Sequence, residues 1–505
     1  MTTDAPFDVL IIGSGFSGLG MAIALKQEGR RSFVVLEKAG EVGGTWRENT
    51  YPGCACDIPS QLYSFSFEPE PNWTRVFPPQ AEILAYLKRC ADKYGVRPHV
   101  AFGAEAVCAV WDEAARLWSV TTRDGRRFRA RTVVAGKGAL HRPAIPDLPG
   151  LESFAGPAFH SAEWRHDVDL AGKRVAVVGA GASAIQFVPK VAPLAERLTV
   201  FQRTPPWIVP KPDRPISEKS RARFARRPWL QAAVRSFWYW FLEKNARARL
   251  DPRLTGPSER LALKHLHAQI ADPGLRAKLT PDYRLGCKRV LISGDYYPAL
   301  TRPNVALETA PIARVEPDAV VTADGRRTTA DVLIFGTGFQ VTDQSADPLE
   351  VVGRGGRRLK DDWRGGLSAH LGITVSGYPN WFLLMGPHTG LGHNSMVYMI
   401  ESQIRYVMSA LKALDRRGAA ALEVTAEAQA AFATEMDRKL QGTVWMSGCG
   451  SWYLDADGRN TTVWPDYTFR YRARTRALNP EDYVFLDAAE AVITAPPAAT
   501  SAAGA

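Results

Sequence analysis

A glycine-rich turn near the N-terminus has the spacing of a loop that binds pyrophosphate. The turn, Gly13-x-Gly15-x-x-Gly18, follows the apolar, β-branched run 7–12 and opens a helical pattern. Such a turn lets a pyrophosphate approach the helix N-terminus, where backbone N–H groups and the helix dipole favour anions. The next apolar run ends at Glu37, about twenty residues after the last glycine, as in dinucleotide-binding units.

The acid at the end of this unit discriminates between dinucleotides. A carboxylate there accepts hydrogen bonds from a ribose 2′-hydroxyl and repels a 2′-phosphate. The first unit is therefore predicted to bind FAD or NAD(H) rather than NADP(H). A glycine turn without a ligand is the alternative, but the complete order of strand, turn, helix, strand and acid argues against it. The residues predicted to bind this dinucleotide are Gly13, Gly15, Phe16, Ser17, Gly18 and Glu37.

A second unit of the same kind has a different residue at its ribose end. Gly179-x-Gly181 follows the apolar run 174–178, and the strand after it leads to Arg203. A guanidinium can bind a phosphate through two hydrogen bonds, so Arg203 suits the 2′-phosphate of NADPH; a surface arginine without a ligand is the alternative. FAD first and NADPH second is the order typical of flavoproteins with two dinucleotides. The NADPH-binding residues predicted here are Gly179, Gly181, Ala182, Ser183, Ala184, Gln202, Arg203 and Thr204.

The composition is that of a globular protein, with 46% hydrophobic and 23% charged residues. The net charge of +11 is spread along the chain without a basic tail or an aromatic–basic RNA motif, so nucleic acid is not an expected partner. The six cysteines lack both C-x-x-C and Cys/His metal spacing, so reduced thiols and no metal are expected. Because neither a signal-peptide pattern nor an apolar run long enough to span a bilayer is apparent, we expect a cytoplasmic location.

The segment between residues 205 and 284 is rich in aromatic residues and is expected to be helical. Basic residues flank the aromatic cluster, so contact with a membrane surface is one interpretation. The other is a helix that packs over the active-site mouth and forms the substrate pocket. We favour packing, because the apolar positions run round the helix rather than along one face. The aromatic residues are Trp229, Phe237, Trp238, Tyr239, Trp240 and Phe241, and the basic ones are Arg226, Arg227, Arg235 and Lys244.

Two longer patterns point to a family. One is Phe154-x-Gly156-x-x-x-His160-x-x-x-Trp164, between the two units. The other begins at Gly43-Gly44-Thr45-Trp46 and continues through Tyr51-Pro52-Gly53 to Asp57. With these patterns the chain resembles the type I Baeyer–Villiger monooxygenases, from Gly13 to about Tyr471. Arg165 departs from the Pro or Asp that the family often has after the signature Trp. Disulfide reductases share the architecture but carry a redox-active cysteine pair where this chain has Trp46.

The resemblance implies an enzyme that uses FAD, NADPH and O₂ to insert one oxygen atom beside a ketone carbonyl, giving an ester or lactone. A small-molecule ketone and O₂ are thus the expected substrates. The oxygen would come from a C4a-peroxyflavin, whose anion the guanidinium of Arg289 would stabilise. Asp57 matches the family's active-site aspartate and would orient Arg289. The alternative roles are a turn or N-cap residue for Asp57 and a surface ion-pair partner for Arg289.

Further residues receive roles from the resemblance. Lys288 is expected at the NADPH 2′-phosphate, and Trp452, in a segment that resembles the family's mobile loop, over the nicotinamide. Tyr63 is expected to contact the flavin, as is the segment that opens a helix over 397–414. The further FAD-binding residues are Thr45, Trp46, Asp57, Tyr63, Val107 and Met396, and the further NADPH-binding residues are Lys288, Arg289 and Trp452.

Two other functions remain open at this point. An N- or S-oxygenating flavin monooxygenase would act through an electrophilic hydroperoxyflavin, which does not need Arg289, and such enzymes usually have Tyr or Phe at the position of Trp164. A nucleotide-sensing or membrane-associated protein without catalysis would need neither Asp57 nor Arg289.

A chain of 505 residues is too long for one hydrophobic core, so several domains are expected. The proline-rich stretch 141–150 is typical of a linker, and the strand and glycine turn at 331–338 resemble the family's return to the FAD domain. The predicted fold class is α/β, with two Rossmann-like dinucleotide-binding domains (a discontinuous FAD domain and an inserted NADPH domain) and a helical insertion. The boundaries are 1–145 and 336–487 for the FAD-binding domain, 146–335 for the NADPH-binding domain, with its insertion over 206–285, and 488–505 for a disordered tail.

Overall fold

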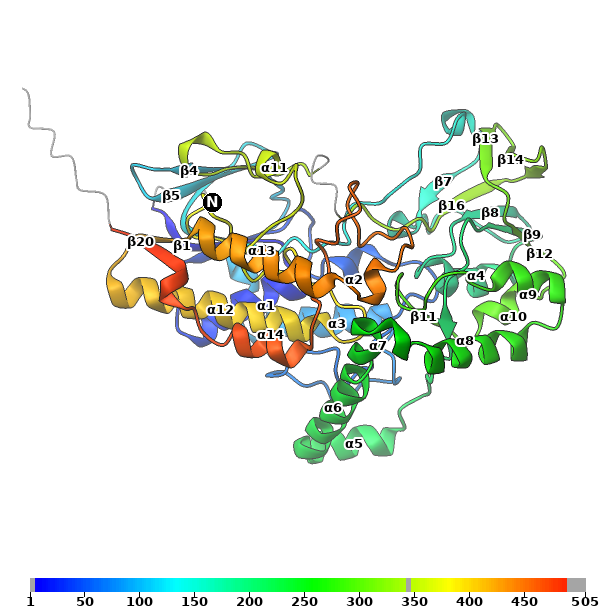
Figure 1. Ribbon diagram of the computed structural model, residues 1–505, viewed down its shortest axis with the longest axis horizontal. Coiled ribbons are helices and arrows are strands. Elements are labelled where there is room, and N and C mark those ends of the chain that lie inside the picture. Colours follow the sequence, from blue (N-terminus) through cyan, green and yellow to red (C-terminus); the bar gives the residue numbers. More distant parts are fainter. Residues whose placement is uncertain (1–4, 342–346, 488–505) are drawn as a thin grey trace, which may run out of the picture.

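The computed structural model describes residues 5–341 and 347–487 (Figure 1). The tail 488–505, for which the sequence predicts disorder, lies outside the described residues. The fold class is α/β, as predicted, with a parallel Rossmann-type sheet around each glycine turn.

The first sheet is built around β1 (Phe7–Ile12), which has β2 (Phe33–Leu36) and β6 (Arg127–Ala135) parallel to it on either side. The last four residues of β1 and all of β2 are buried, which explains their continuous apolar sequences. Strands from late in the chain join this sheet, because β17 (Glu350–Val352) pairs with β4 and β18 (Trp381–Leu383) pairs with β6. The strand order is β17-β4-β5-β6-β1-β2-β3, with β3 at Val100–Ala101, β4 at Ala106–Asp112 and β5 at Leu117–Thr122.

The second sheet has the order β12-β9-β8-β16-β7, and all its neighbouring strands are parallel. Its strands are β7 (Ala158–His160), β8 (Arg174–Val178), β9 (Arg197–Phe201), β12 (Val305–Glu308) and β16 (Val332–Phe335). It lies to the right of the first sheet in Figure 1. Smaller sheets pair β10 (Ile208–Val209) with β11 (Leu291–Ile292), β14 (Ala319–Thr322) with β13 (Ile312–Glu316) and β15 (Arg327–Thr329), and β19 (Ala421–Val424) with β20 (Tyr483–Leu486).

Helices pack against both sheets and enclose separate cores. Beside the first sheet, α1 (Phe16–Gln27) packs closely on α12 (Met396–Arg417), since a Cβ atom on Gly20 would lie 2.9 Å from the side chain of Ile404. The other helices of this part are α2 (Thr45–Glu48), α3 (Gln80–Lys93), α11 (Leu359–Asp362), α13 (Ala426–Leu440) and α14 (Thr468–Arg474). Those near the second sheet are α4 (Ala184–Val191), α8 (Gly256–Gln269), α9 (Pro273–Leu279) and α10 (Tyr296–Leu300).

The insertion is helical, as predicted, but its aromatic residues are not packed as predicted. Helices α5 (Glu218–Arg226) and α6 (Pro228–Glu243) project from the lower edge of the molecule in Figure 1, and α7 (Ala246–Leu250) leads back. Tyr239 is buried, but Trp229, Phe237, Trp240 and Phe241 are 67%, 59%, 58% and 41% exposed. The prediction that the helix covers the active-site mouth with these side chains is therefore wrong. Among the described residues, no helix combines the length and apolarity needed to cross a membrane.

Candidate active site

The first glycine turn is shaped for close approach of a ligand to the helix N-terminus. Gly13 has a φ of +93°, and a Cβ atom on Gly18 would lie 1.8 Å from the carbonyl oxygen of Gly13. Helix α1 begins at Phe16, followed by Ser17, and within the described residues no side chain caps its N-terminus. The free N–H groups of this first turn fit the pyrophosphate of a dinucleotide.

Glu37 lies directly after β2, at the predicted ribose end of the turn. Its buried carboxylate accepts hydrogen bonds from the backbone N–H groups of Ser14 and Ala39, both at 3.0 Å, and pairs with Arg47 at 3.0 Å. These contacts fix the carboxylate beside the turn. The backbone carbonyl of Glu37 accepts a hydrogen bond from the N–H of Ala104 at 2.8 Å, just before β4, which contains Val107.

The Gly-Gly-Thr-Trp pattern crosses over this turn. Gly44 has a φ of +52°, and a Cβ atom on it would lie 3.1 Å from the Cα atom of Gly15, so this close crossing favours glycine. Thr45 begins α2, and the indole N–H of Trp46 donates to the hydroxyl of Tyr63 at 3.1 Å. The rings of Trp46 and Phe16 pack edge-on against Tyr63, with centroids at 5.5 and 5.2 Å. The structure thus brings the predicted FAD residues of three separate segments together.

The second glycine turn repeats this geometry. Gly179 has a φ of +105°, and its Cβ position lies 2.5 Å from the carbonyl oxygen of Gly336. Helix α4 begins at Ala184, after Gly181, Ala182 and Ser183, and no side chain in the described part of the chain caps it. Its N-terminus is therefore also free to bind a pyrophosphate.

The predicted phosphate-binding residues of the second unit line one cavity. The cavity, of about 670 Å³, is bordered by Arg203 and Lys288 from segments far apart in the chain. Burial and the nearby Arg203 lower the pKa of Lys288, and the carboxylate of Asp282, which also lines the cavity, only partly opposes this shift. A bound phosphate would relieve this repulsion. Gln202, Thr204, Lys278 and Arg284 also line the cavity.

Replacing Arg203 with Ala should narrow the preference for NADPH over NADH. A charge-assisted contact contributes roughly 1.5–3 kcal/mol, so the ratio of the two KM values should fall by about 10- to 100-fold. The measurement is the rate of flavin reduction against the concentration of each cofactor. Arg197→Ala, at an exposed site at the start of β9, is the matched control. An unchanged ratio in the Arg203 variant would show that the 2′-phosphate binds elsewhere.

Asp57 and Arg289 form an ion pair, although 232 residues separate them. Burial raises the pKa of Asp57, but the charge and hydrogen bond of Arg289 outweigh it and hold that pKa below its usual value. The carboxylate in turn raises the pKa of Arg289 further. Both groups are therefore charged throughout the working pH range. The charges of Asp57 and Arg289 both influence the pKa of the Tyr63 hydroxyl, so the pair lies near the predicted flavin site.

Hydrogen bonds join the segment that carries Asp57 to the second nucleotide unit. Gln186 of α4 accepts hydrogen bonds from the hydroxyl of Tyr51 (3.0 Å) and the N–H of Ala55 (3.2 Å), and donates to the carbonyl of Ala55 (3.0 Å). Gly53, with a φ of +81°, allows this contact, because a Cβ atom there would lie 2.7 Å from the Gln186 carbonyl. The pattern through Tyr51 and Gly53 thus fixes Asp57 between the two nucleotide sites.

The pattern Phe154-x-Gly156-x-x-x-His160-x-x-x-Trp164 contributes to the packing around the second sheet. His160 ends β7, is fully buried, and its Nδ1 atom accepts from the N–H of Ala162 at 3.1 Å. Burial lowers its pKa to about 4, so the ring stays neutral. Gly156 has its Cβ position 2.1 Å from the carbonyl oxygen of Asp331, and Trp164 packs on Phe187 with ring centroids at 5.4 Å. The signature residues therefore join the second sheet to its helix rather than contact Arg289.

Replacing His160 with Asn should make the protein less sensitive to acid. In the unfolded state this histidine has a pKa near 6.5, whereas burial lowers its pKa in the folded state to about 4. Protonation therefore favours the unfolded state, and the protein loses stability as the pH falls through that interval. The cost reaches about 2 kcal/mol at pH 5. Urea unfolding at pH 7.5 and pH 5 measures it, with the exposed His166→Asn as control. An equal loss in both variants would contradict a neutral, buried His160.

Trp452 lies on the surface beside a buried tyrosine, and its place over the nicotinamide stays a prediction. Trp452 is 41% exposed and packs against Tyr453 in a tilted arrangement, with ring centroids at 4.3 Å. Tyr453 is the buried member of the pair, and the positive charges of Arg289 and Arg249 act on its hydroxyl. Burial raises the pKa of Tyr453, which therefore remains a hydroxyl donor. The sequence analysis missed Tyr453 and Arg249; adjacency to Trp452 could have indicated the first, but no local pattern marks the second.

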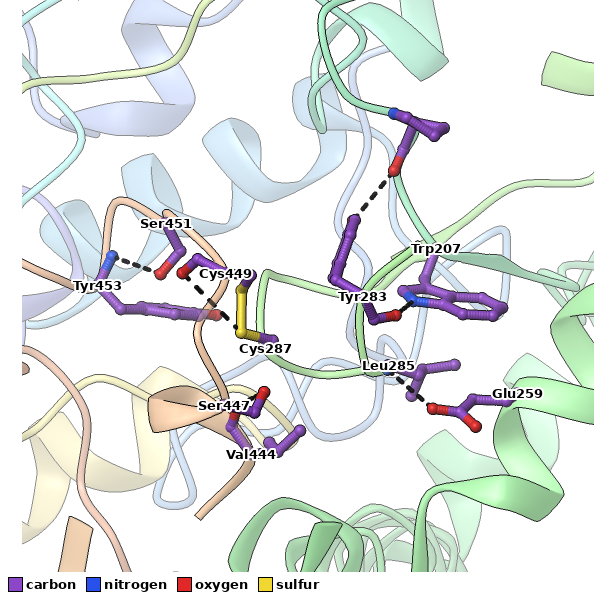
Figure 2. The surroundings of a disulfide bond; sticks show 11 residues. Trp207, Glu259, Tyr283, Leu285, Cys287, Val444, Ser447, Cys449, Ser451 and Tyr453 are labelled. Atoms are coloured by element: carbon purple, nitrogen blue, oxygen red, sulfur yellow. Dashed lines mark hydrogen bonds between the residues drawn. A yellow bond between two sulfur atoms is a disulfide. The ribbon is translucent and has the colours of Figure 1, made fainter. Parts of the chain in front are cut away.

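A disulfide between Cys287 and Cys449 contradicts the prediction that all cysteines are reduced. The two Cα atoms lie 6.2 Å apart, and the bond joins the segment before Lys288 to the loop before Trp452 (Figure 2). Spacing could not reveal it, because 162 residues separate the pair. Cys449 and its neighbours line the cavity that holds Arg203 and Lys288, so the disulfide fixes one wall of the predicted NADPH site.

Reduction of this disulfide should loosen the loop. A dithiol reductant would give two thiols, and we expect faster proteolysis between residues 446 and 460 and a Kd for NADP⁺ higher by about 3- to 10-fold, since a preorganised wall is lost. Cys449→Ser should behave the same way without reductant, whereas Cys108→Ser, at a free cysteine of the first sheet, should not. Equal proteolysis of the oxidised and reduced protein would contradict this expectation.

Met396, the remaining FAD residue, begins α12. The side chain of Ser395 at its N-cap is buried, and its hydroxyl has no hydrogen-bond partner among the described residues. Asn394 is held by Glu243 of α6 at 2.6 Å. A free N-terminus with an unsatisfied hydroxyl fits a ligand that accepts hydrogen bonds, such as a flavin.

Cysteines near the flavin site do not suit dithiol chemistry. Cys54 and Cys56 are both free. Burial raises the pKa of Cys54 to about 11, and burial with the neighbouring Asp57 raises that of Cys56 well above its usual value. Neither thiol is a ready thiolate.

Comparison with known proteins gives a consistent result. Residues 10–228 match a family described as pyridine nucleotide-disulphide oxidoreductase. A protein of Pseudomonas aeruginosa named Baeyer-Villiger monooxygenase is 51% identical over 94% of this chain and 90% of its own. The structure of oxidized steroid monooxygenase bound to NADP is 32% identical, covers 96% of this chain and 100% of its own, and has a TM-score of 0.85. A structure of OTEMO in complex with FAD and NADP is 29% identical, covers 95% and 100%, and has a TM-score of 0.86.

Proposed function

The chain belongs to the family of Baeyer–Villiger monooxygenases and is an FAD- and NADPH-dependent monooxygenase, and on that premise we propose that Arg289, oriented by Asp57, drives insertion of oxygen beside a ketone carbonyl. The observation that carries the proposal is the Asp57–Arg289 ion pair near Tyr63, on a segment that hydrogen bonds of Gln186 join to α4. The products are an ester or a lactone.

Arg289 is suited to stabilise negative charge on oxygen. When bound, the reduced flavin supplies, with O₂, the oxygen atom that is transferred to the ketone. Negative charge develops on the attacking oxygen and then on the carbonyl oxygen, and a fixed guanidinium stabilises both without losing its proton. In the described part of the chain Asp57 contacts the guanidinium through Nη2, which leaves N–H groups of the fork for the reacting oxygens.

Asp57 acts through Arg289 as a positioning residue. Its ionised carboxylate fixes the direction of the guanidinium and balances its charge in a half-buried place. Tyr453, whose hydroxyl lies near Arg289, can add a neutral donor to the same region. Arg289 thus meets the substrate in one orientation, which is the condition for electrostatic preorganisation.

The cavity with Arg203 and Lys288 would retain the oxidised nucleotide. Two cations facing a 2′-phosphate, and a wall fixed by the Cys287–Cys449 disulfide, favour slow release. A nucleotide that stays bound excludes water from the Arg289 side of the site. We therefore assign Gln202, Arg203, Thr204 and Lys288 to phosphate binding.

The domain boundaries follow as part of the proposal. We assign 1–145 and 336–487 to the FAD-binding domain and 146–335 to the NADPH-binding domain. Support comes from the second sheet, whose strands all lie between Ala158 and Phe335. The cytoplasmic location also stays a proposal, and the disulfide removes its argument from reduced thiols, because such bonds are rare in cytosolic proteins. Cell fractionation would decide it.

A substrate panel tests the proposed reaction. The purified holoenzyme should convert some linear, cyclic, aryl or steroidal ketones to esters or lactones, with consumption of NADPH and O₂. Amines and sulfides form the comparison set, because an electrophilic oxygenating site would prefer them. Efficient oxygenation of amines or sulfides, with no ester from any ketone, would contradict the proposal.

A further inference from the structure

Helix α6 presents an apolar face to solvent and a polar face to the protein. Its exposed positions recur every three to four residues and therefore form one stripe along the helix. The exposed residues of the helix are Pro228, Trp229, Ala232, Ala233, Ser236, Phe237, Trp240 and Phe241, and the exposed Lys244 follows at its C-terminal end. We call Trp229, Phe237, Trp240 and Phe241 the α6 aromatic face. A helix that packs on a protein core has the opposite arrangement, so this stripe needs another explanation.

The inward face of α6 is held by polar contacts. The side chain of Gln231 donates to Gln61 Oε1 and to the carbonyl of Glu70, both at 2.7 Å. Arg235 donates to the carbonyls of Gln61 and Ser64 at 3.1 Å. These bonds fix the rotation of the helix.

The same face is fixed at the C-terminal end of α6. The hydroxyl of Tyr239 lies 2.9 Å from Thr468 Oγ1, and the buried carboxylate of Glu243 accepts from the N–H of Thr468 and the amide of Asn394, both at 2.6 Å. Rotating α6 to hide its aromatic side chains would break all these hydrogen bonds and leave Glu243 unpaired, which is expensive. These hydrogen bonds therefore hold the α6 aromatic face towards solvent.

The surroundings of the aromatic face are basic. Between residues 218 and 250 the chain has nine Lys or Arg residues and two Glu residues, and one of the latter, Glu243, is buried. The exposed cations are Lys219, Arg223, Arg226, Arg227, Lys244 and Arg247. Phe469 of α14, 38% exposed and 6.0 Å from the ring of Trp240, extends the apolar surface.

We propose that the α5–α6 projection docks the enzyme on an anionic lipid surface, with the α6 aromatic face in the interfacial layer and the basic residues against the headgroups. Tryptophan is favoured at this depth, and Lys and Arg near the surface are attracted by anionic lipids. The basic rim argues against a second copy of the chain as the occupant, because a two-fold contact would set like charges against each other. The projection of α5 and α6 from the body leaves room for a flat partner (Figure 1).

Vesicle co-sedimentation of the holoenzyme tests the proposal. Vesicles of equimolar phosphatidylglycerol and phosphatidylcholine should bind the protein, and binding to phosphatidylcholine alone should be at least about 10-fold weaker. Serine at Phe237, Trp240 and Phe241 together should lower partitioning to the anionic vesicles at least about 100-fold. Serine at Arg223, Arg226 and Arg227 should lower it by about 10- to 100-fold and flatten its dependence on salt.

The controls separate docking from damage to the fold. Leu194→Ser and Val484→Ser change residues that are 54% and 52% exposed on other elements, and both should bind like the wild type. All variants should keep FAD and oxidise NADPH normally, because the changed side chains lie outside the site. Absence of wild-type binding, or equal binding by the aromatic and control variants, would overturn the proposal. So would a wild-type dimer, seen without lipid by sedimentation velocity, that the aromatic variant dissociates.

Discussion

Replacing Arg289 with Ala should lower the rate of ester formation by about 100- to 1000-fold, while FAD stays bound and NADPH is still oxidised. Removing one preorganised donor to a developing oxyanion typically costs roughly 2.7–4 kcal/mol. Hydride transfer to the flavin creates no such oxyanion, so it should be affected much less. Ester formation by chromatography and NADPH oxidation by absorbance, measured on the same preparation, give the two rates.

Two further variants separate charge from geometry. Arg289→Lys keeps the charge but not the planar fork towards Asp57, so it should recover only part of the rate. Asp57→Asn should leave Arg289 charged but less well oriented, with a smaller loss than Arg289→Ala. Full ester formation by Arg289→Ala would remove this residue from the reaction and, with it, the main physical reason for a nucleophilic mechanism.

Replacing Gly18 with Ala should produce a protein that purifies with little or no FAD. A Cβ atom at this position would lie 1.8 Å from the backbone carbonyl of Gly13, and neither segment can yield without opening the turn. Overpacking of this kind typically costs about 1–3 kcal/mol, so the affinity for FAD should fall by about 10- to 100-fold or more. Flavin absorbance of the purified protein and a fluorescence titration with FAD measure the loss.

Gly40→Ala is the matched control for this change. Gly40 lies in the same region, but nothing lies within 4 Å of its Cβ position and its backbone is not in the left-handed region. It should bind FAD like the wild type. If Gly18→Ala also kept its flavin, the first turn would not be the FAD site. The assignment of Phe16, Ser17 and Glu37 to FAD binding would then be wrong as well.

Local sequence predicted the dinucleotide units because their features are local. The strands β1 and β8 have the predicted bounds, since a buried parallel strand requires a continuous apolar run of limited length. Glycines are required in the two turns because neighbouring backbone atoms leave no room for a Cβ atom. Helix α12 extends slightly beyond the predicted range, as helix ends often do.

Contacts between residues that are far apart in the sequence could not be predicted from local sequence patterns. The pairing of Asp57 with Arg289 was expected from the family resemblance alone, because the two positions are 232 residues apart. The Cys287–Cys449 disulfide was missed for the same reason. The outward aromatic face of α6 was misjudged because its orientation is set by hydrogen bonds of Gln231, Tyr239 and Glu243 to other segments, which the helix sequence does not contain.

The fraction of NADPH consumption that ends in ester rather than hydrogen peroxide is the most direct measure of the role of Arg289. Both products should be quantified in one reaction, with wild type and Arg289→Ala matched in FAD content and saturated with NADPH and an accepted ketone. We predict that the wild type forms ester almost stoichiometrically with NADPH, whereas the variant forms almost only hydrogen peroxide. A variant that still converts most of its NADPH into ester would contradict the account.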